Sequence, residues 1–170
     1  SYALTGTEWD NEQQTFLGPI CGAVGPDGAL YVGSIHDSGW LGGQNTGEIV
    51  RLRPDGSKLP NGIRELRATP EGFEIEFVRP VDAKMAEEAA NYQISGYTRV
   101  WEGSYATPDS GRYQPRIGKV QLSADGRVVR LAVDDLREKY VYELTLSVRS
   151  ADGSKLSPEA AHYTMNSVPQ

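Results

Sequence analysis

The chain has 170 residues, enough for one domain or one domain with an appendage, and its net charge of −6 argues against binding to a nucleic-acid phosphate backbone. Nineteen glycines, ten prolines and only two methionines favour turn-rich β structure over helices. No apolar run approaches the roughly 18 residues of a transmembrane helix. The single cysteine, Cys21, excludes an internal disulfide, and we interpret it as a small buried hydrophobic residue.

Residues 20–56 contain two Pro-Asp-Gly turns between strand-like runs. In the first turn Pro26 presets φ, Asp27 bonds to its own downstream backbone, and Gly28 supplies a positive φ. The order of turn, Ala-Leu-Tyr-Val, loop and Gly-Glu-Ile-Val-Arg-Leu is typical of one β-propeller blade. Propellers contain roughly 4–8 blades, so a single copy predicts part of a larger protein or a partner for another chain.

The turn residues at 57–62 predict a short linker and a domain boundary. We therefore expect a propeller-blade-like segment at 1–60 and an all-β, immunoglobulin-like or fibronectin-like β-sandwich at 61–170. Strands are predicted at 63–68, 73–78, 92–101, 117–122, 128–133, 140–148 and 162–165, with a short helix at 83–90 capped by Asp82. A hairpin turn is expected at 123–126.

Two local patterns support the sandwich. Phe73, Ile75 and Phe77 alternate with two glutamates, as in a strand that is buried on one face. Leu136 stands six residues before Tyr142, which resembles the spacing of the tyrosine corner in fibronectin type III modules. In such a corner the tyrosine hydroxyl bonds back to the backbone of the preceding loop.

The combination of blade and sandwich resembles the C-terminal region of large secreted or periplasmic bacterial proteins related to glucose/sorbosone dehydrogenases. The likeness rests on residues 28–33, 47–53, 77–82, 91–92, 97–101, 104–110, 122–126 and 163–166. The second half also resembles immunoglobulin-like modules of bacterial surface proteins. The resemblance implies a periplasmic or extracellular location. It also implies that any quinone, haem or catalytic group lies in parts of such proteins that this chain does not include. No cofactor, metal or catalytic residue is therefore assigned to this chain.

The first candidate site is the glycine-rich loop at 34–45, which holds His36, Asp37 and Trp40. Loops on rigid β scaffolds tend to carry binding groups. His36 and Asp37 could serve as a base or as metal ligands, but adjacent residues of an extended chain point in opposite directions. The alternative is that Trp40 packs against a neighbouring domain.

The second candidate site is the aperiodic stretch at 101–116, which is long for a loop in a compact domain. Its aromatic and basic residues suit stacking on a sugar or a protein surface, or contact with the blade-like segment. These candidate residues are Trp101, Tyr105, Arg112, Tyr113 and Arg116.

The sequence predicts a non-catalytic accessory or interaction module at the C-terminus of a larger exported dehydrogenase-like protein. Its partners would be propeller or other domains of the parent protein, or another chain. There is no Gly-x-Ser-x-Gly elbow and no phosphate-binding Gly-x-x-x-x-Gly-Lys loop. Two alternatives remain open. The chain could help to wall the active site of a quinone- or haem-dependent sugar dehydrogenase, or it could be a carbohydrate-binding module.

Overall fold

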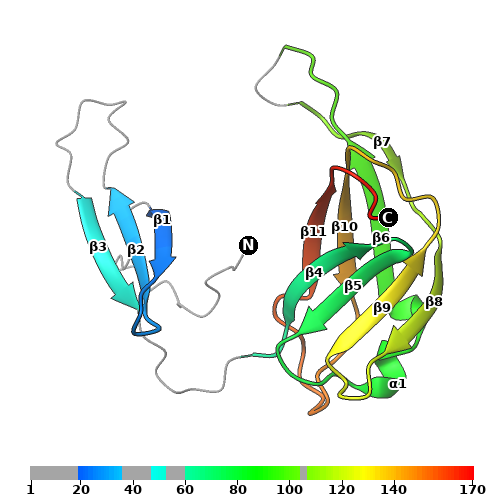
Figure 1. Ribbon diagram of the computed structural model, residues 1–170, viewed down its shortest axis with the longest axis horizontal. Helices are drawn as coiled ribbons and strands as arrows, with labels where there is room; N and C mark the ends of the chain where they lie inside the picture. The colour runs from blue at the N-terminus through cyan, green and yellow to red at the C-terminus, as the bar shows by residue number, and fades with distance from the viewer. Residues whose placement is uncertain (1–18, 36–46, 53–59, 104–106) are drawn as a thin grey trace. The chain divides into compact units, whose positions relative to one another are not determined.

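The computed structural model describes residues 19–35, 47–52, 60–103 and 107–170 (Figure 1). The chain divides into two compact units, residues 1–58 and 59–170. The described part of the first unit is an antiparallel sheet in the order β1 (Pro19–Val24), β2 (Leu30–Ile35) and β3 (Gly47–Leu52). This three-stranded sheet lies within residues 1–60, the segment for which the sequence predicts a blade-like hairpin region.

The turn between β1 and β2 has the conformation that its Pro-Asp-Gly sequence predicts. Gly28 has a φ of 73°, and its amide donates to the carbonyl oxygen of Gly25 over 3.0 Å. The Asp27 carboxylate accepts a hydrogen bond from the Ala29 amide at 3.3 Å and also forms an ion pair with Arg51 on β3. This ion pair is the main reason why the pKa of Asp27 is lowered. The second Pro-Asp-Gly turn lies outside the described residues.

The prediction that Cys21 is buried is wrong, because its side chain is exposed. Cys21 lies on β1, an edge strand, opposite Gly33 of β2. A β-carbon added to Gly33 would lie 2.7 Å from the cysteine sulfur. The thiol therefore lies over a residue without a side chain, and a glycine offers little apolar surface to cover it.

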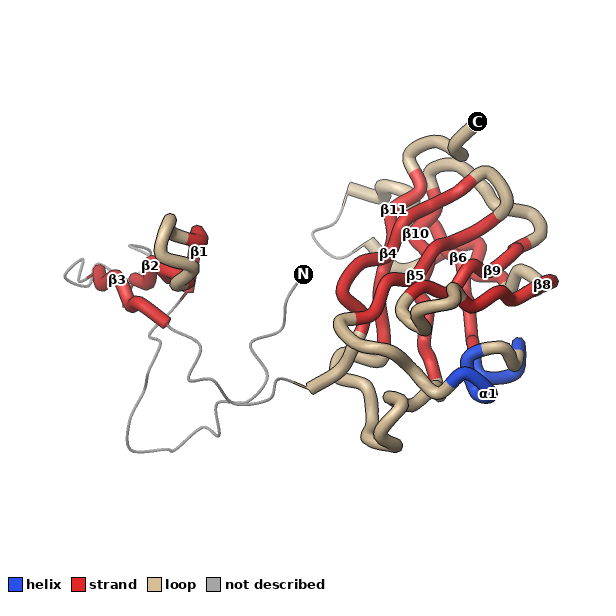
Figure 2. Tube along the Cα trace, turned by 60° about the horizontal axis from the view of Figure 1, so that its bottom comes forward, coloured by secondary structure: helices blue, strands red, loops and turns tan. Residues whose placement is uncertain are grey.

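The second unit is a β-sandwich of two four-stranded antiparallel sheets, which face each other in Figures 1 and 2. One sheet has the order β4-β5-β9-β8 and the other β11-β10-β6-β7. The strands are β4 (Ile63–Thr69), β5 (Gly72–Phe77), β6 (Tyr92–Thr98), β7 (Ser110–Tyr113), β8 (Ile117–Leu122), β9 (Val128–Val133), β10 (Tyr140–Leu146) and β11 (Ala160–Met165). Lettered A to G in chain order, with β7 as C′, they give A-B-E-D against G-F-C-C′. This is the strand order of an immunoglobulin-like sandwich, so the predicted fold class is confirmed.

The alternating pattern of β5 places its apolar residues in the core, as predicted. Phe73, Ile75 and Phe77 are buried between the sheets, opposite Tyr142 and Leu144 of β10. The intervening glutamates face outward and form ion pairs across the sheet with Arg64, Arg67 and Arg130. The sandwich core is thus built by the period-2 pattern, and its outer face carries paired charges.

The predicted helix at 83–90 is shorter than expected. Asp82 caps α1 (Ala83–Ala86) by accepting a hydrogen bond from the Met85 amide at 2.8 Å, as predicted. The chain then forms a separate 3₁₀ turn, η1 (Ala89–Asn91), and enters β6. The Asn91 side chain donates to the Met85 carbonyl oxygen at 2.8 Å, so it bonds a carbonyl at the end of α1.

Asn61 and Gly62, predicted as part of a linker, are instead buried in the sandwich. The Asn61 carboxamide donates to the carbonyl oxygens of Arg79 and Pro80 and to the hydroxyl of Ser150, at 3.0–3.2 Å. Its oxygen accepts from the amides of Arg79 and Gly62 at 2.8 and 3.0 Å. This side chain therefore fastens the entry to β4 onto two other segments, which turn-like composition alone does not reveal.

Gly72, at the start of β5, provides a test of how closely β5 and β9 approach. A β-carbon at this position would lie 1.9 Å from the Leu131 carbonyl oxygen. We expect Gly72→Ala to lower the free energy of unfolding by about 1–3 kcal/mol, because backbone must move to admit a methyl group. Gly118→Ala on β8 is the matched control, since its β-carbon would meet only ordinary contacts at 3.7 Å and beyond. Equal urea midpoints for both variants would contradict this packing.

Candidate functional site

The structure describes four of the eight predicted site residues. His36, Asp37, Trp40 and Tyr105 lie outside the described residues. Trp101 follows β6 and is 74% exposed, with the exposed Val100 beside it. Arg112 and Tyr113 lie on β7, and Arg116 precedes β8, where it forms an exposed ion pair with Asp134 at 2.7 Å.

The stretch at 101–116 contains a strand that the sequence analysis missed. β7 has only four residues and pairs with β6 at Gly96 and Thr98, with an irregularity between them. The sequence of β7, Ser-Gly-Arg-Tyr, shows no alternation of apolar and polar residues. Gly111 within it also has a positive φ of 59°, which is unusual for a strand. Because neighbours on a strand point to opposite faces, Arg112 and Tyr113 do not share a surface.

Arg112 lies at the centre of a polar cluster on the outer face of the β11-β10-β6-β7 sheet. Its guanidinium bonds to Asp109 at 2.7 Å, Glu143 at 3.2 Å and the Ser95 hydroxyl at 2.6 Å. It also stacks 4.4 Å from the ring centre of Tyr97. Tyr97 is consequently only 8% exposed, so its ring is covered by protein. The Arg112 hydrogen bond is the main cause of the lowered pKa of Asp109.

Tyr113 points to the other side and joins the tyrosine corner predicted from Leu136 and Tyr142. The Arg137 amide donates to the Tyr142 hydroxyl at 2.6 Å, which confirms the predicted corner. The Tyr142 hydroxyl lies 2.7 Å from the Tyr113 hydroxyl, which donates to the Asp135 carbonyl oxygen at 2.7 Å. The Tyr142 hydroxyl also lies 3.4 Å from the Arg137 carbonyl oxygen, so its one proton can serve either that carbonyl or the Tyr113 hydroxyl. Together the bonds form a relay from the Arg137 amide to the Asp135 carbonyl.

Gly96 and Arg137 allow the rings of Tyr113 and Tyr142 to pack closely against each other. A β-carbon on Gly96 would lie 2.5 Å from the Tyr113 ring and 3.1 Å from the Tyr142 ring, so glycine makes their approach possible. The Arg137 guanidinium stacks 3.8 Å from the centre of the Tyr113 ring. Burial raises the pKa of Tyr113, with the Tyr142 hydrogen bond adding to it. Tyr113 therefore remains a neutral structural hydroxyl at ordinary pH.

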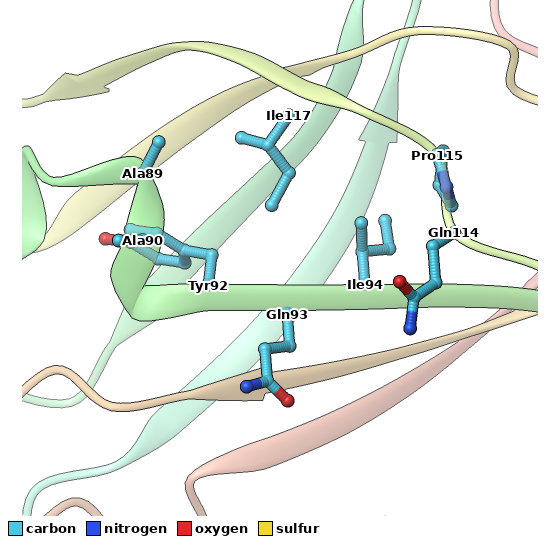
Figure 3. Close-up of a pocket in the computed structure, with 8 residues that line it drawn as sticks. All are labelled: Ala89, Ala90, Tyr92, Gln93, Ile94, Gln114, Pro115 and Ile117. Atoms are coloured by element: carbon cyan, nitrogen blue, oxygen red, sulfur yellow. The ribbon is translucent and has the colours of Figure 1, made fainter.

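A groove of about 540 Å³ opens between η1, β6 and the segment that leads into β8 (Figure 3). Its lining residues are Ala89, Ala90, Tyr92, Gln93, Ile94, Gln114, Pro115 and Ile117. None of them is a carboxylate, imidazole, thiol or amine. The Tyr92 hydroxyl donates to the Ala86 carbonyl oxygen at 2.7 Å, and burial raises its pKa. The groove thus offers shape and amide groups but no acid or base for chemistry at neutral pH.

Within the described ranges, no three His, Cys, Asp or Glu side chains gather in a way that could hold a metal ion. No helix among the same residues is long and apolar enough to cross a membrane.

No protein-family model and no curated protein matches the chain. Solved structures with a similar fold include the S-layer protein rSbsC, with a TM-score of 0.47, 18% identity, and coverage of 64% of this chain and 14% of that chain. Domains 1–6 of surface layer protein SbsC give a TM-score of 0.45 at 18% identity, covering 62% and 14%. The N-terminal part of the bacterial S-layer protein SbsC gives 0.43 at 18%, covering 61% and 22%. This chain thus spans less than a quarter of each of these proteins.

The corner relay predicts a stability effect that depends on a hydroxyl alone. Tyr142→Phe leaves the Arg137 amide and the Tyr113 hydroxyl without their partner, so we expect a loss of about 1–3 kcal/mol in the free energy of unfolding. Tyr113→Phe should show coupling with it in a double-mutant cycle. Tyr163→Phe, whose ring packs on Phe73, is the control. Strictly additive effects would show that the two hydroxyls do not act together.

The Arg112 cluster predicts a dependence of stability on acid pH. Because the folded-state pKa of Asp109 is lowered, its ionised form stabilises the fold above the unfolded-state pKa of about 4, and this contribution is lost as pH falls through the lower folded-state value. Asp109→Asn should flatten the fall in stability below pH 4, measured by urea unfolding across pH. Added salt should reduce the difference, since the pair is exposed. An unchanged acid slope would contradict the assignment.

Proposed function

We propose that the chain is a non-catalytic interaction module of a larger exported protein, in which the sheet of the first unit packs against further protein. The observation that carries this proposal is the exposure of large apolar side chains on that sheet. Ile20, Val24 and Ile49 are 64%, 73% and 77% exposed, whereas Val32 and Ala29 are buried. Soluble monomers seldom leave such patches uncovered.

The register of the sheet places Val24 and Ile49 on opposite faces, and Val32, on the same face as Val24, is covered within the chain. Val24 lies opposite Leu30, and Ile49 lies opposite Gly33. Leu30 and Gly33 are three residues apart on one strand, so they and their partners point to opposite faces. A propeller blade is a sheet that needs cover on both faces, which supports the proposed parent: an exported, dehydrogenase-like propeller protein with this chain at its C-terminus.

The two alternative functions have less support from the described residues. For carbohydrate binding, an open aromatic surface is needed, yet Tyr97 is covered by Arg112 and the Tyr113 hydroxyl is used in the corner. Trp101 is the exposed aromatic side chain among the described candidates. For a role in walling a dehydrogenase active site, the lining of the groove beside η1 and β6 carries no carboxylate, imidazole, thiol or amine. The proposed location, periplasmic or extracellular, follows from the proposed parent.

Replacing the exposed apolar side chains of Val24 and Ile49 by threonine, which also favours strands, tests the proposal. We expect the unchanged chain to bind the dye ANS and to self-associate with rising concentration. Val24→Thr with Ile49→Thr should reduce both effects and leave the melting of the sandwich unchanged, because these side chains contact little in the chain itself. Val78→Thr, which changes an exposed apolar residue of the second unit, is the control. A chain that stays monomeric and binds no dye at any concentration would overturn the proposal.

A further inference from the structure

Asn61 and Gly62 form the only Asn-Gly pair in the sequence. In such a pair the glycine amide nitrogen attacks the asparagine carboxamide more readily than in other pairs, since glycine has no β-carbon to hinder the approach. The other four asparagines precede Glu, Thr, Tyr or Ser. The sequence therefore has one position where spontaneous deamidation is favoured, and the structure determines when it happens.

In the folded sandwich the reacting groups are held in a geometry that opposes the reaction. The Asn61 side chain is fully buried, and its nitrogen donates to the Arg79 and Pro80 carbonyls and to Ser150. The Gly62 amide donates to the Asn61 side-chain oxygen at 3.0 Å, so it faces that oxygen and retains its proton. Attack would require this nitrogen to lose its proton and to approach the carboxamide carbon from above its plane.

The backbone of Gly62 has no room to rotate toward that arrangement. A β-carbon on Gly62 would lie 2.2 Å from the Ser157 carbonyl oxygen, so the chain at 157–158 packs directly on it. Two backbone hydrogen bonds hold the same contact: the Ser157 amide donates to the Asn61 carbonyl at 2.7 Å, and the Ile63 amide donates to the Pro158 carbonyl at 3.1 Å. Burial also keeps out the water that must remove the proton.

We propose that Asn61 is a latent self-modification site, protected in the folded sandwich and converted when the sandwich opens. The Gly62 nitrogen loses its proton to water and bonds to the Asn61 side-chain carbon, and the side-chain nitrogen leaves as ammonia. Water then opens the resulting succinimide at either carbonyl, which gives aspartate or isoaspartate. No other reactant is needed.

Either product prevents the original contacts from re-forming. A carboxylate at position 61 has no N–H groups and would set oxygens against the Arg79 and Pro80 carbonyl oxygens. Isoaspartate also lengthens the backbone between the two hydrogen bonds to residues 157 and 158. Unfolding that lasts long enough for deamidation thus becomes irreversible.

The test compares the unchanged protein under folding conditions and in concentrated urea, at the same mildly alkaline pH and temperature. Peptide mapping by mass spectrometry follows the conversion of Asn61, with Asn91 and Asn166 as internal references. We expect conversion to be at least about tenfold slower in the folded protein, because only opened molecules react. The refolded fraction after removal of urea should fall in step with conversion. Equal conversion rates in the two conditions, or full refolding of converted chains, would overturn the proposal.

Two variants separate the protection of Asn61 from the general behaviour of the chain. Ser150→Ala removes one acceptor of the Asn61 nitrogen, so it should raise the conversion rate of the folded protein and leave the rate in urea unchanged. Ser154→Ala changes an exposed hydroxyl in the same turn, which bonds Asp152, and should alter neither rate. A Ser150→Ala protein that converts no faster than the unchanged one would contradict the role of these hydrogen bonds.

Discussion

The side chain of Tyr142 is fully buried and joins several parts of the sandwich through its ring and its hydroxyl. The ring lies 5.4 Å from that of Phe73 in the opposite sheet, measured between centroids. A buried hydroxyl without a partner costs roughly 1–3 kcal/mol, so the connection between β9 and β10 must bring backbone groups to it. That connection contains Asp135 and Lys139 at φ values of 56° and 64°, which non-glycine residues rarely adopt. Burial of one side chain thus determines the path of a loop.

The same constraint operates where the chain enters the sandwich. Asn61 is buried, and both polar atoms of its side chain are hydrogen-bonded, to two segments distant in sequence, residues 79–80 and Ser150, and to the adjacent Gly62 amide. A satisfied buried amide of this kind specifies one arrangement of the backbone more strictly than an apolar residue would, because a shifted arrangement leaves donors unpaired. Tyr142 and Asn61 therefore define the geometry of the two regions where the sandwich depends on irregular backbone.

Sequence patterns predicted the regular parts of this fold and missed the parts that depend on tertiary contacts. β5 and β9 follow from alternation, β8 follows from its place before the predicted turn at 123–126, and the corner follows from the spacing of Leu136 and Tyr142. β7 was missed because its four residues are held by pairing with β6 and by Gly111, which no local pattern reports. Asn61 was predicted to lie in a linker because asparagine is common in turns, and the sequence alone does not distinguish a turn asparagine from a buried one that is hydrogen-bonded. The ion pair of Arg112 with Glu143 could not be predicted either, because Glu143 is distant in sequence and only the fold brings the two together.

The two units differ in the side chains that they expose to solvent. The described outer faces of the sandwich carry arginines bound to carboxylates, as with Arg67 on one sheet and Arg112 on the other. Such internally paired charges contribute little to stability and offer little net attraction to a charged partner. The sheet of the first unit has the opposite character, with Val24 and Ile49 exposed on its two faces. Apolar association gains free energy in proportion to the area covered, so these side chains, like Val100 and Trp101 of the sandwich, would contribute most where they become covered.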